Sequence, residues 1–312
     1  MNLLRNIKSF CRYIVRYPKR LLNTIRLYTT LQSNSYIFIQ MSVKWKGLSI
    51  VKYNFGDDLN VFLLEKLTGK RVLKYDEFLH IHKENILGIG SIIEYKCNSN
   101  SIIWGSGALY GNPNFKVRPS KVLATRGPLT KHYIESFGVE CPCLFGDPAL
   151  LLPLVYPVKE RKILYEIGFI PHYSEKELPH IKIFRKKHPE YKFIDLQQYQ
   201  NWNDIIDDIL SCKSIVSSSL HGLIISDAYK IPNVYVSFSN SLAGGTFKFR
   251  DYFEGVNRRY APPLNFRNSI DINKIQNSVE KYVPIAYDVT KLLEVFPYPI
   301  LEKYKVFITN NK

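Results

Sequence analysis

The chain has 312 residues, of which 46% are hydrophobic, so it is long enough for two ordinary domains with buried cores. Its 43 lysines and arginines outnumber 27 acids and give a formal net charge of +16. The five cysteines are scattered and odd in number, which excludes a disulfide framework and favours a reducing compartment. Only Cys141 and Cys143 lie close together, so no metal site is predicted.

The positive charge is concentrated in an N-terminal arm, residues 1–40. Ten bases and no acid precede Asp57, and beyond them the charges nearly balance. On a helical wheel the bases from Arg5 to Arg26 occupy about one third of the circumference, with leucine, isoleucine and phenylalanine gathered opposite. The pattern predicts a basic amphipathic helix, interrupted or restarted at Pro18.

Three interpretations of this arm remain open. No stretch approaches the roughly 20 apolar residues of a membrane span, and no signal-peptide cleavage pattern is present. We favour attachment to the anionic inner face of the cytoplasmic membrane, in an otherwise cytoplasmic protein. The alternatives are a helix that packs on its own domain with a solvated basic face, and a cleaved organellar transit peptide. No nucleic acid partner is expected, because no recognisable reading module follows the bases.

The rest of the chain alternates short apolar runs with helical patterns, which predicts an α/β fold with mostly parallel sheets. In the first half we expect strands at 43–45, 71–74, 85–88, 102–104 and 121–124, and helices at 57–68 and 128–137. Gly69 and Gly138 suit the ends of these two helices.

The alternation restarts after a proline-rich linker at 148–157. We expect strands at 162–170, 191–195, 214–216 and 233–236, with helices at 175–187, 204–211 and 220–229. The prediction is therefore two doubly wound, Rossmann-like domains, residues 41–155 and 156–265, with a cleft between them. Helices at 266–312 are expected to cross back over the first domain.

Ligands of open α/β sheets bind beyond the carboxyl ends of the strands, so the strand-to-helix turns are the places to search. The stretch from Asn54 to Asn60, with Asp57 near its start, predicts a capped turn or a ligand contact. Gly105 and Ser106, in "WGSGALYG", allow a close approach of the backbone to a ligand. The run is not a dinucleotide fingerprint, because its third glycine is displaced.

Arg126 follows another strand, in "ATRGPLT". A guanidinium there suits a carboxylate or phosphate, or equally an ion pair between the domains. Ser217, Ser218 and Ser219 end a strand and begin a helix, where hydroxyl and free N–H groups suit an anion. His221 lies in the first turn of that helix, and His172 follows a neighbouring strand. Each histidine is a candidate for a catalytic role or for a structural one.

Together these stretches resemble the polysaccharide pyruvyl transferase family. The resemblance runs over roughly residues 45–260, through "NFGDDLN", "WGSGAL", "ATRGPLT", "FGDPALLLP", "GFIPHYSE", "SSSLHGLIISDAYKIPNV" and "KFRDYF". It implies a GT-B-like pair of domains, the first on the acceptor side and the second on the donor side. It also implies transfer of pyruvate from phosphoenolpyruvate onto a sugar of an exopolysaccharide, capsule or other cell-surface glycan. The acceptor is an oligosaccharide or a lipid-linked glycan.

One departure stands out. Many members of the family have Arg-Leu-His where this chain has Ser219-Leu220-His221, so an arginine associated with the donor anion is missing. The resemblance and the chemistry assign His221 the role of general acid or base and Arg126 a contact with the donor anion. Lys248 is the candidate for the missing charge, and His172 and Asp147 are secondary catalytic candidates. The reaction needs no cofactor or metal.

Two rival functions remain open at this point. The first is a GT-B-type glycosyltransferase that uses a nucleotide sugar, in which Glu254 would hold the ribose. The second is a membrane-associated scaffold without catalytic activity, in which Ser219 marks a lost active site.

Overall fold

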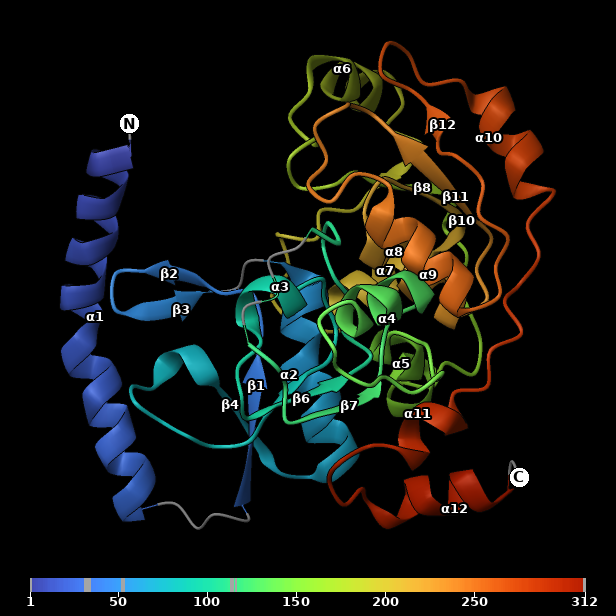
Figure 1. Ribbon diagram of the computed structural model, residues 1–312. Helices are drawn as coiled ribbons and strands as arrows, with labels where there is room; N and C mark the ends of the chain where they lie inside the picture. The colour runs from blue at the N-terminus through green and yellow to red at the C-terminus, as the bar shows by residue number, and fades with distance from the viewer. Residues whose placement is uncertain (1, 31–34, 52–53, 113–114, 116, 311–312) are drawn as a thin grey trace.

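The computed structural model describes residues 2–30, 35–51, 54–112, 115 and 117–310, which form two five-stranded sheets with helices packed around them (Figure 1). Every strand pair within the two sheets is parallel, as the sequence predicts. The strands of the first sheet, in spatial order, are β4 (Arg71–Lys74), β1 (Tyr36–Gln40), β5 (Asn85–Leu87), β6 (Ser101–Trp104) and β7 (Lys121–Ala124).

The second sheet repeats the topology of the first. In spatial order its strands are β12 (Leu264–Asn265), β11 (Asn233–Ser237), β10 (Cys212–Ser217), β8 (Tyr165–Ile170) and β9 (Lys192–Phe193). In both sheets the first strand of the chain lies between the second and the third. The strand order therefore reverses between β1 and β5 in one sheet and between β8 and β10 in the other, and doubly wound folds bind ligands at such points.

The helices follow the predicted alternation, with shifted ends. The longer ones between the strands are α2 (Phe55–Thr68), α4 (Pro128–Glu135), α6 (Pro179–Lys187), α7 (Asp204–Leu210), α8 (Leu220–Ala228) and α9 (Phe247–Gly255). The short ones are α3 (Ile93–Lys96), η2 (Tyr75–Glu77), η3 (Pro148–Leu151) and α5 (Leu152–Val155). Helix α6 starts four residues later than expected, because Leu178, before Pro179, has a ψ of 138°, outside the helical region.

The first strand of the fold lies in the segment that we assigned to the arm. β1 pairs with both β4 and β5, so the first sheet begins before residue 41. The expected strand at 43–45 instead belongs to a separate hairpin of β2 (Lys44–Lys46) and β3 (Ser49–Val51). The run "YIFIQ" of β1 was overlooked because its neighbours are polar and it stands outside the expected alternation.

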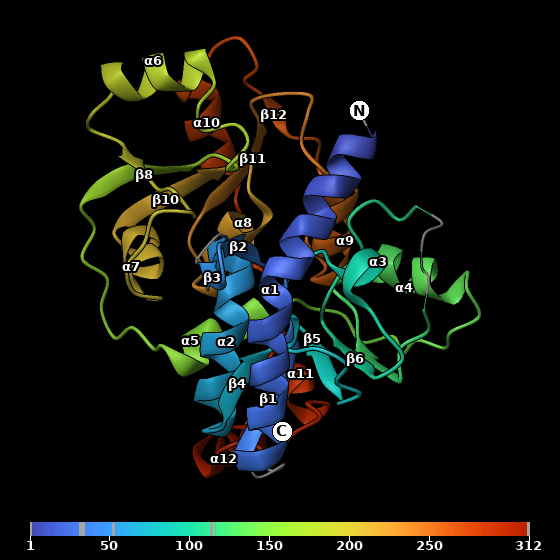
Figure 2. The same cartoon turned by 90° about the vertical axis from the view of Figure 1, so that its left-hand side faces the viewer.

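The basic part of the arm is a single helix, α1 (Asn2–Thr30), that continues through Pro18, so the predicted interruption is wrong. Figure 2 shows it lying across the outside of the first half. Leu27 is buried against Phe38 and Phe78, and Arg20 Nη2 donates to the carbonyl of Phe78 at 2.6 Å. Within the described residues, no helix is long and apolar enough to cross a bilayer.

The tail returns to the first half, as predicted. It forms α10 (Ile272–Val279), α11 (Thr290–Glu294) and α12 (Glu302–Asn310), of which the last two lie below the first sheet in Figure 1. Trp104 Nε1, at the end of β6, donates to the carbonyl of Leu292 at 2.9 Å. The N–H of Leu301 donates to the carbonyl of Leu67 at 2.8 Å. The tail therefore packs against the first half at the end of β6 and near the end of α2.

A buried ion pair joins the two halves close to the site. Arg126, which follows β7, donates through Nε to Asp251 Oδ2 of α9 at 3.0 Å, and both side chains are fully buried. Asp251 also accepts from the N–H of Thr130 at 2.8 Å and from its hydroxyl at 2.6 Å. Arg126 Nη2 donates to the carbonyl of Ala108 at 2.7 Å.

Glycines make room for this pair. A Cβ on Gly107 would lie 2.1 Å from Cζ of Arg126, and a Cβ on Gly127 would lie 1.7 Å from the carbonyl oxygen of Asp251. These contacts are far below van der Waals distance, so the glycines are needed for α9 to approach the first half. The ion pair therefore fixes α9 against the end of β7.

Removing one partner of this ion pair should strongly destabilise the protein. We expect Asp251→Leu and Arg126→Met each to lower the free energy of unfolding by about 3–5 kcal/mol, because each leaves a buried charge unpaired. The double variant should lose less than the sum of the two. Urea unfolding followed by circular dichroism measures all three.

The surface pair on the same helix provides the control. Arg250 and Glu254 are bonded at 2.6 Å but are partly exposed, so Arg250→Met should cost less than about 1 kcal/mol. Strictly additive losses at Arg126 and Asp251 would contradict a coupled buried pair.

Candidate active site

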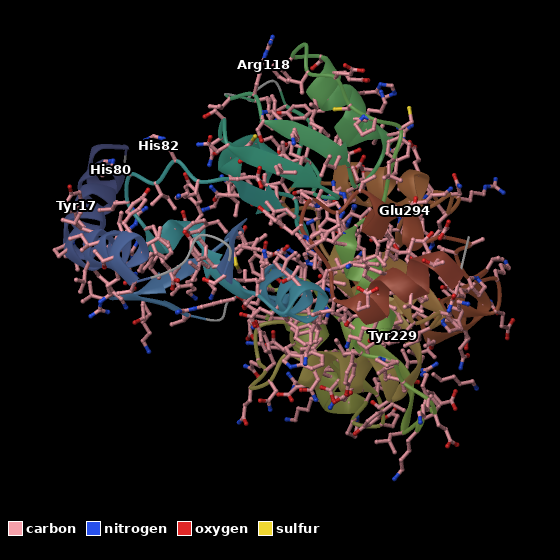
Figure 3. All side chains as sticks on the ribbon, turned by 90° about the horizontal axis from the view of Figure 1, so that it is seen from below. Tyr17, His80, His82, Arg118, Tyr229 and Glu294 are labelled. Carbon is pink, nitrogen blue, oxygen red and sulfur yellow. The ribbon has the colours of Figure 1, made fainter. Side chains whose placement is uncertain are left out.

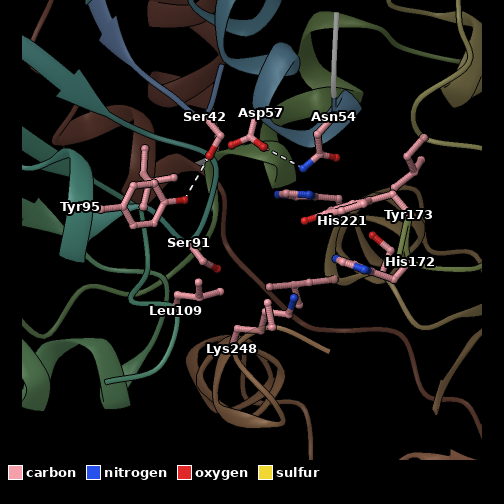
Figure 4. A pocket seen from close by; sticks show the side chains of 15 residues that line it. Ser42, Asn54, Asp57, Ser91, Tyr95, Leu109, His172, Tyr173, His221 and Lys248 are labelled. Atoms are coloured by element: carbon pink, nitrogen blue, oxygen red, sulfur yellow. Dashed lines mark hydrogen bonds between the residues drawn. The ribbon is translucent and has the colours of Figure 1, made fainter. Parts of the chain in front are cut away.

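A cavity of about 130 Å³ lies between the carboxyl ends of the two sheets (Figure 4). Ser42 follows β1 and Ser91 lies just beyond β5, so both come from the reversal point of the first sheet. His172 follows β8 and Ser219 follows β10, at the reversal point of the second sheet. The two reversal points therefore face each other across one pocket, as the ligand-binding rule for such sheets predicts.

His221 lies in the first turn of α8 and crosses to the first half. Its ring packs directly on Gly56 of α2, where an added Cβ would lie 1.9 Å from His221 Nδ1. Burial, then the positive charges of Lys248 and Arg126, lower the pKa of His221 to about 3. The ring is therefore neutral at physiological pH and can accept a proton.

His172 is held in one tautomer. Its Nδ1 accepts a hydrogen bond from the N–H of Ser174 at 3.3 Å and lies 2.7 Å from the Ser174 hydroxyl. The proton of the neutral ring is therefore on Nε2. Burial, and then the charge of Lys248, lower the pKa of His172 to about 3. The backbone N–H of His172 donates to Ser218 Oγ at 2.9 Å, which fixes the turn after β8.

Lys248, on α9, is the cation of the pocket. It is 7% exposed, and within the described part of the chain no carboxylate lies within ion-pair distance of its ammonium group. Burial, then the charge of Arg126, lower the pKa of Lys248 to about 8, against the opposing fields of Glu175 and Asp57. A buried cation without a paired anion marks a place where an anionic ligand is stabilised.

Asp57 faces this group from the first turn of α2. It is 5% exposed, and its Oδ2 accepts from Asn54 Nδ2 at 2.7 Å. Burial raises the pKa of Asp57 to about 7, although the hydrogen bond from Asn54 opposes the shift. Near neutral pH this carboxyl is therefore present in both protonation states, which suits proton transfer.

Six of the predicted site residues line the cavity. Three have basic side chains, His172, His221 and Lys248, and the other three are Asn54, Asp57 and Ser219. Ser219 begins α8 but makes no capping bond with its side chain, so the N–H groups of the first turn are not satisfied by it.

The other predicted residues lie outside the lining of the cavity. Arg126 forms the ion pair with Asp251, so its contacts match the second interpretation of this residue, an ion pair between the two halves. Its Nη1 also donates to Ser91 Oγ, which does line the cavity. Arg126 therefore contacts a lining residue without being part of the lining, and its expected contact with the donor anion does not fit this geometry.

Asp147 and four small residues have structural contacts instead. Asp147 is fully buried and caps η3 by accepting from the N–H of Ala149 at 2.9 Å. The hydroxyls of Ser217, Ser218 and Ser106 bond to backbone groups, and Gly105 is packed against Pro148. Their side chains shape the turns that carry the site, and the cavity lining does not include them.

Several lining residues escaped the sequence analysis. Ser42 and Tyr95 form one pair, with their hydroxyl oxygens 3.1 Å apart, and Ser91 and Tyr173 complete the polar rim (Figure 4). Ser42 was missed together with β1. Ser91 could have been found, because it closely follows an expected strand, and Tyr173 is adjacent to His172.

The contact between His221 and Gly56 can be tested by a double-mutant cycle. Gly56→Ala should lower the free energy of unfolding by about 1–3 kcal/mol, because the methyl group overlaps the imidazole. In a His221→Ala background the same change should cost much less, since the ring is gone. Equal costs in both backgrounds would show that the ring does not pack on Gly56.

Known proteins resemble this chain in sequence. A succinoglycan biosynthesis protein, ExoV of Rhizobium meliloti (strain 1021), is 27% identical over 215 residues, which cover 67% of this chain and 63% of ExoV. An uncharacterized protein, L143 of Acanthamoeba polyphaga mimivirus, is 29% identical over 233 residues, covering 72% of this chain and 79% of L143. The sequence model of one family matches residues 54–240, more than half of the chain and most of the site. The chain belongs to the polysaccharide pyruvyl transferase family.

Proposed function

We propose that this protein transfers pyruvate from phosphoenolpyruvate to two hydroxyls of one sugar, forming a ketal on an exopolysaccharide, capsule or other cell-surface glycan. Membership of the family and the similarity to a succinoglycan biosynthesis protein support transfer to a polysaccharide. The proposed arrangement is GT-B-like, with the acceptor on the side of the first sheet and the donor on the side of the second.

Lys248, a buried cation with no carboxylate at ion-pair distance among the described residues, is the observation that carries the proposal for the donor. Phosphoenolpyruvate has a phosphate and a carboxylate, and both need positive partners in a site that excludes water. Lys248 and the N-terminus of α8 line the same cavity, and Ser219 stands there at the position where the family resemblance implies an arginine. In the proposal Lys248 supplies the charge that Ser219 lacks.

The cavity lining contains groups for both proton transfers. In the proposed reaction, protonated Asp57 gives a proton to the methylene carbon, and neutral His221 takes a proton from the attacking hydroxyl. The first hydroxyl oxygen bonds to the adjacent carbon, the bond from that carbon to the phosphate oxygen breaks, and the second hydroxyl closes the ketal. Two hydroxyl protons are released, one replacing that used at the methyl group and one leaving with phosphate. Phosphoenolpyruvate is a substrate, and these steps use no metal or cofactor.

The geometry favours this donor over a nucleotide sugar. The cavity of about 130 Å³ is smaller than the roughly 300–1,000 Å³ typical of sites for larger organic ligands. Glu254, the expected partner of a ribose, is bonded to Arg250 and lies outside the cavity lining. Burying a cation beside neutral histidines costs stability. A scaffold without catalytic activity would gain nothing that offsets this cost.

Incubation with phosphoenolpyruvate and an oligosaccharide or lipid-linked glycan tests the proposal. We expect release of phosphate and a gain in acceptor mass of one pyruvate less one water. Lys248→Met should raise KM for phosphoenolpyruvate by about tenfold or more, since a charged hydrogen bond contributes about 1.5–3 kcal/mol. Lys248→Arg should recover part of the affinity. Turnover of a nucleotide sugar without phosphate release from phosphoenolpyruvate would reject the proposal, and so would no turnover with either donor.

The pH profile tests the role of Asp57. The acid must be protonated, so kcat/KM should fall as the pH rises through about 7, and more steeply above about 8 where Lys248 loses its charge. His221 stays neutral down to about pH 3, so it adds no limb on the acid side of neutrality. Asp57→Asn should lower kcat by about 10²–10⁴ and remove the limb near pH 7. A retained limb in this variant would assign the titration to another group.

A further inference from the structure

Helix α1 is attached to the protein by a face that is polar apart from the buried Leu27. Asn23 Nδ2 donates to the carbonyl of Glu77 at 3.0 Å, and the hydroxyl of Thr24 bonds to both the N–H and the carbonyl of Leu79. Arg16 Nε donates to the carbonyl of Gly47 at 3.4 Å, with its guanidinium over the Trp45 ring. The same side brings Tyr17 against His80, at a ring distance of 6.5 Å (Figure 3).

The apolar face of the same helix consequently points away from the protein. Val15 is 57% exposed, Leu22 46% and Ile25 51%, and Leu21 and Tyr28 are also exposed. At 100° per residue these five side chains cover an arc of about 140°, centred opposite the attached face. We call this surface the outer stripe. A helix on a water-soluble body ordinarily places its apolar face inward, and a continuous exposed stripe marks a contact surface.

Charge identifies the partner of the outer stripe. Lys19 and Arg26 are exposed along one edge of it, and α1 contains no acidic residue. Two copies meeting at this face would bring these like charges together, whereas an anionic bilayer would attract them. Apolar side chains flanked by bases are the pattern of a helix that lies in the membrane interface.

We propose that the outer stripe of α1, Val15, Leu21, Leu22, Ile25 and Tyr28, inserts into the surface of an anionic membrane, with Lys19 and Arg26 at the level of the headgroups. Because Arg16, Arg20, Asn23 and Thr24 bind the helix to the first half, the whole protein is held at the bilayer rather than tethered by a loose arm. This inference does not depend on the proposed reaction.

Sedimentation with vesicles tests the proposal without any substrate. The full chain should bind vesicles of roughly two parts phosphatidylcholine to one part phosphatidylglycerol at least tenfold more tightly than vesicles of phosphatidylcholine alone. Leu22→Glu combined with Ile25→Glu should weaken binding by about tenfold or more, and Lys19→Glu with Arg26→Glu should remove the preference for phosphatidylglycerol. Both pairs are exposed, so circular dichroism and thermal melting should match the unchanged chain.

Ile183→Glu is the matched control. Ile183 is 56% exposed on α6, far from α1 in the fold, and its replacement should leave vesicle binding within twofold. Undiminished binding by the Leu22 and Ile25 variant would overturn the proposal. The proposal would also be overturned if the full chain did not bind vesicles and instead formed a dimer, seen by light scattering, that this variant dissociates. The stripe would then join two copies. Phosphate release on a free oligosaccharide reports the proposed reaction separately.

Discussion

The buried ion pair between Arg126 and Asp251 is the constraint on which the site depends. It holds α9, and with it Lys248, against the end of the first sheet, where glycines at 107 and 127 leave room for the contact. The second close approach, of His221 to Gly56, joins α8 to α2 in the same region. Groups from the two sheets therefore face each other at fixed positions. The pocket is a property of the pair of sheets and of neither one alone.

Burial decides the chemistry available in this pocket. The same exclusion of water keeps both histidines neutral, lowers the pKa of Lys248 and raises that of Asp57. The result is a site in which a buried cation lies beside neutral imidazoles and an acid that titrates near neutral pH. A bound anion would offset the cost of burying Lys248, would raise the pKa of Asp57 further, and would oppose the lowering of the pKa values of Lys248 and the two histidines. In the proposed reaction, this shared field couples donor binding to proton transfer.

Much of this arrangement could be predicted from the sequence, and the failures have physical reasons. The alternation of apolar runs with helices identified both sheets, and the rule on strand ends located His172, Ser219 and His221. β1 was missed because a short buried strand next to a polar segment has no clear boundary, and Ser42 was lost with it. Arg126 has the right residue type in the right turn, but its partner, Asp251, lies 125 positions away in the chain and is set by tertiary packing. Asp147 makes a local contact instead, because it caps the η3 helix that begins at the next residue. Periodicity also gave the two faces of α1 without showing which one meets the protein.

A crystal structure of the protein with phosphoenolpyruvate tests the central claim most directly. The account predicts the phosphate or the carboxylate within hydrogen-bond distance of Lys248 Nζ, the other anionic group toward the first turn of α8, and the methylene carbon facing Asp57. Arg126 should keep its bonds to Asp251. Donor bound elsewhere, or held by Arg126 after it has left Asp251, would contradict the assignment of this pocket as the donor site.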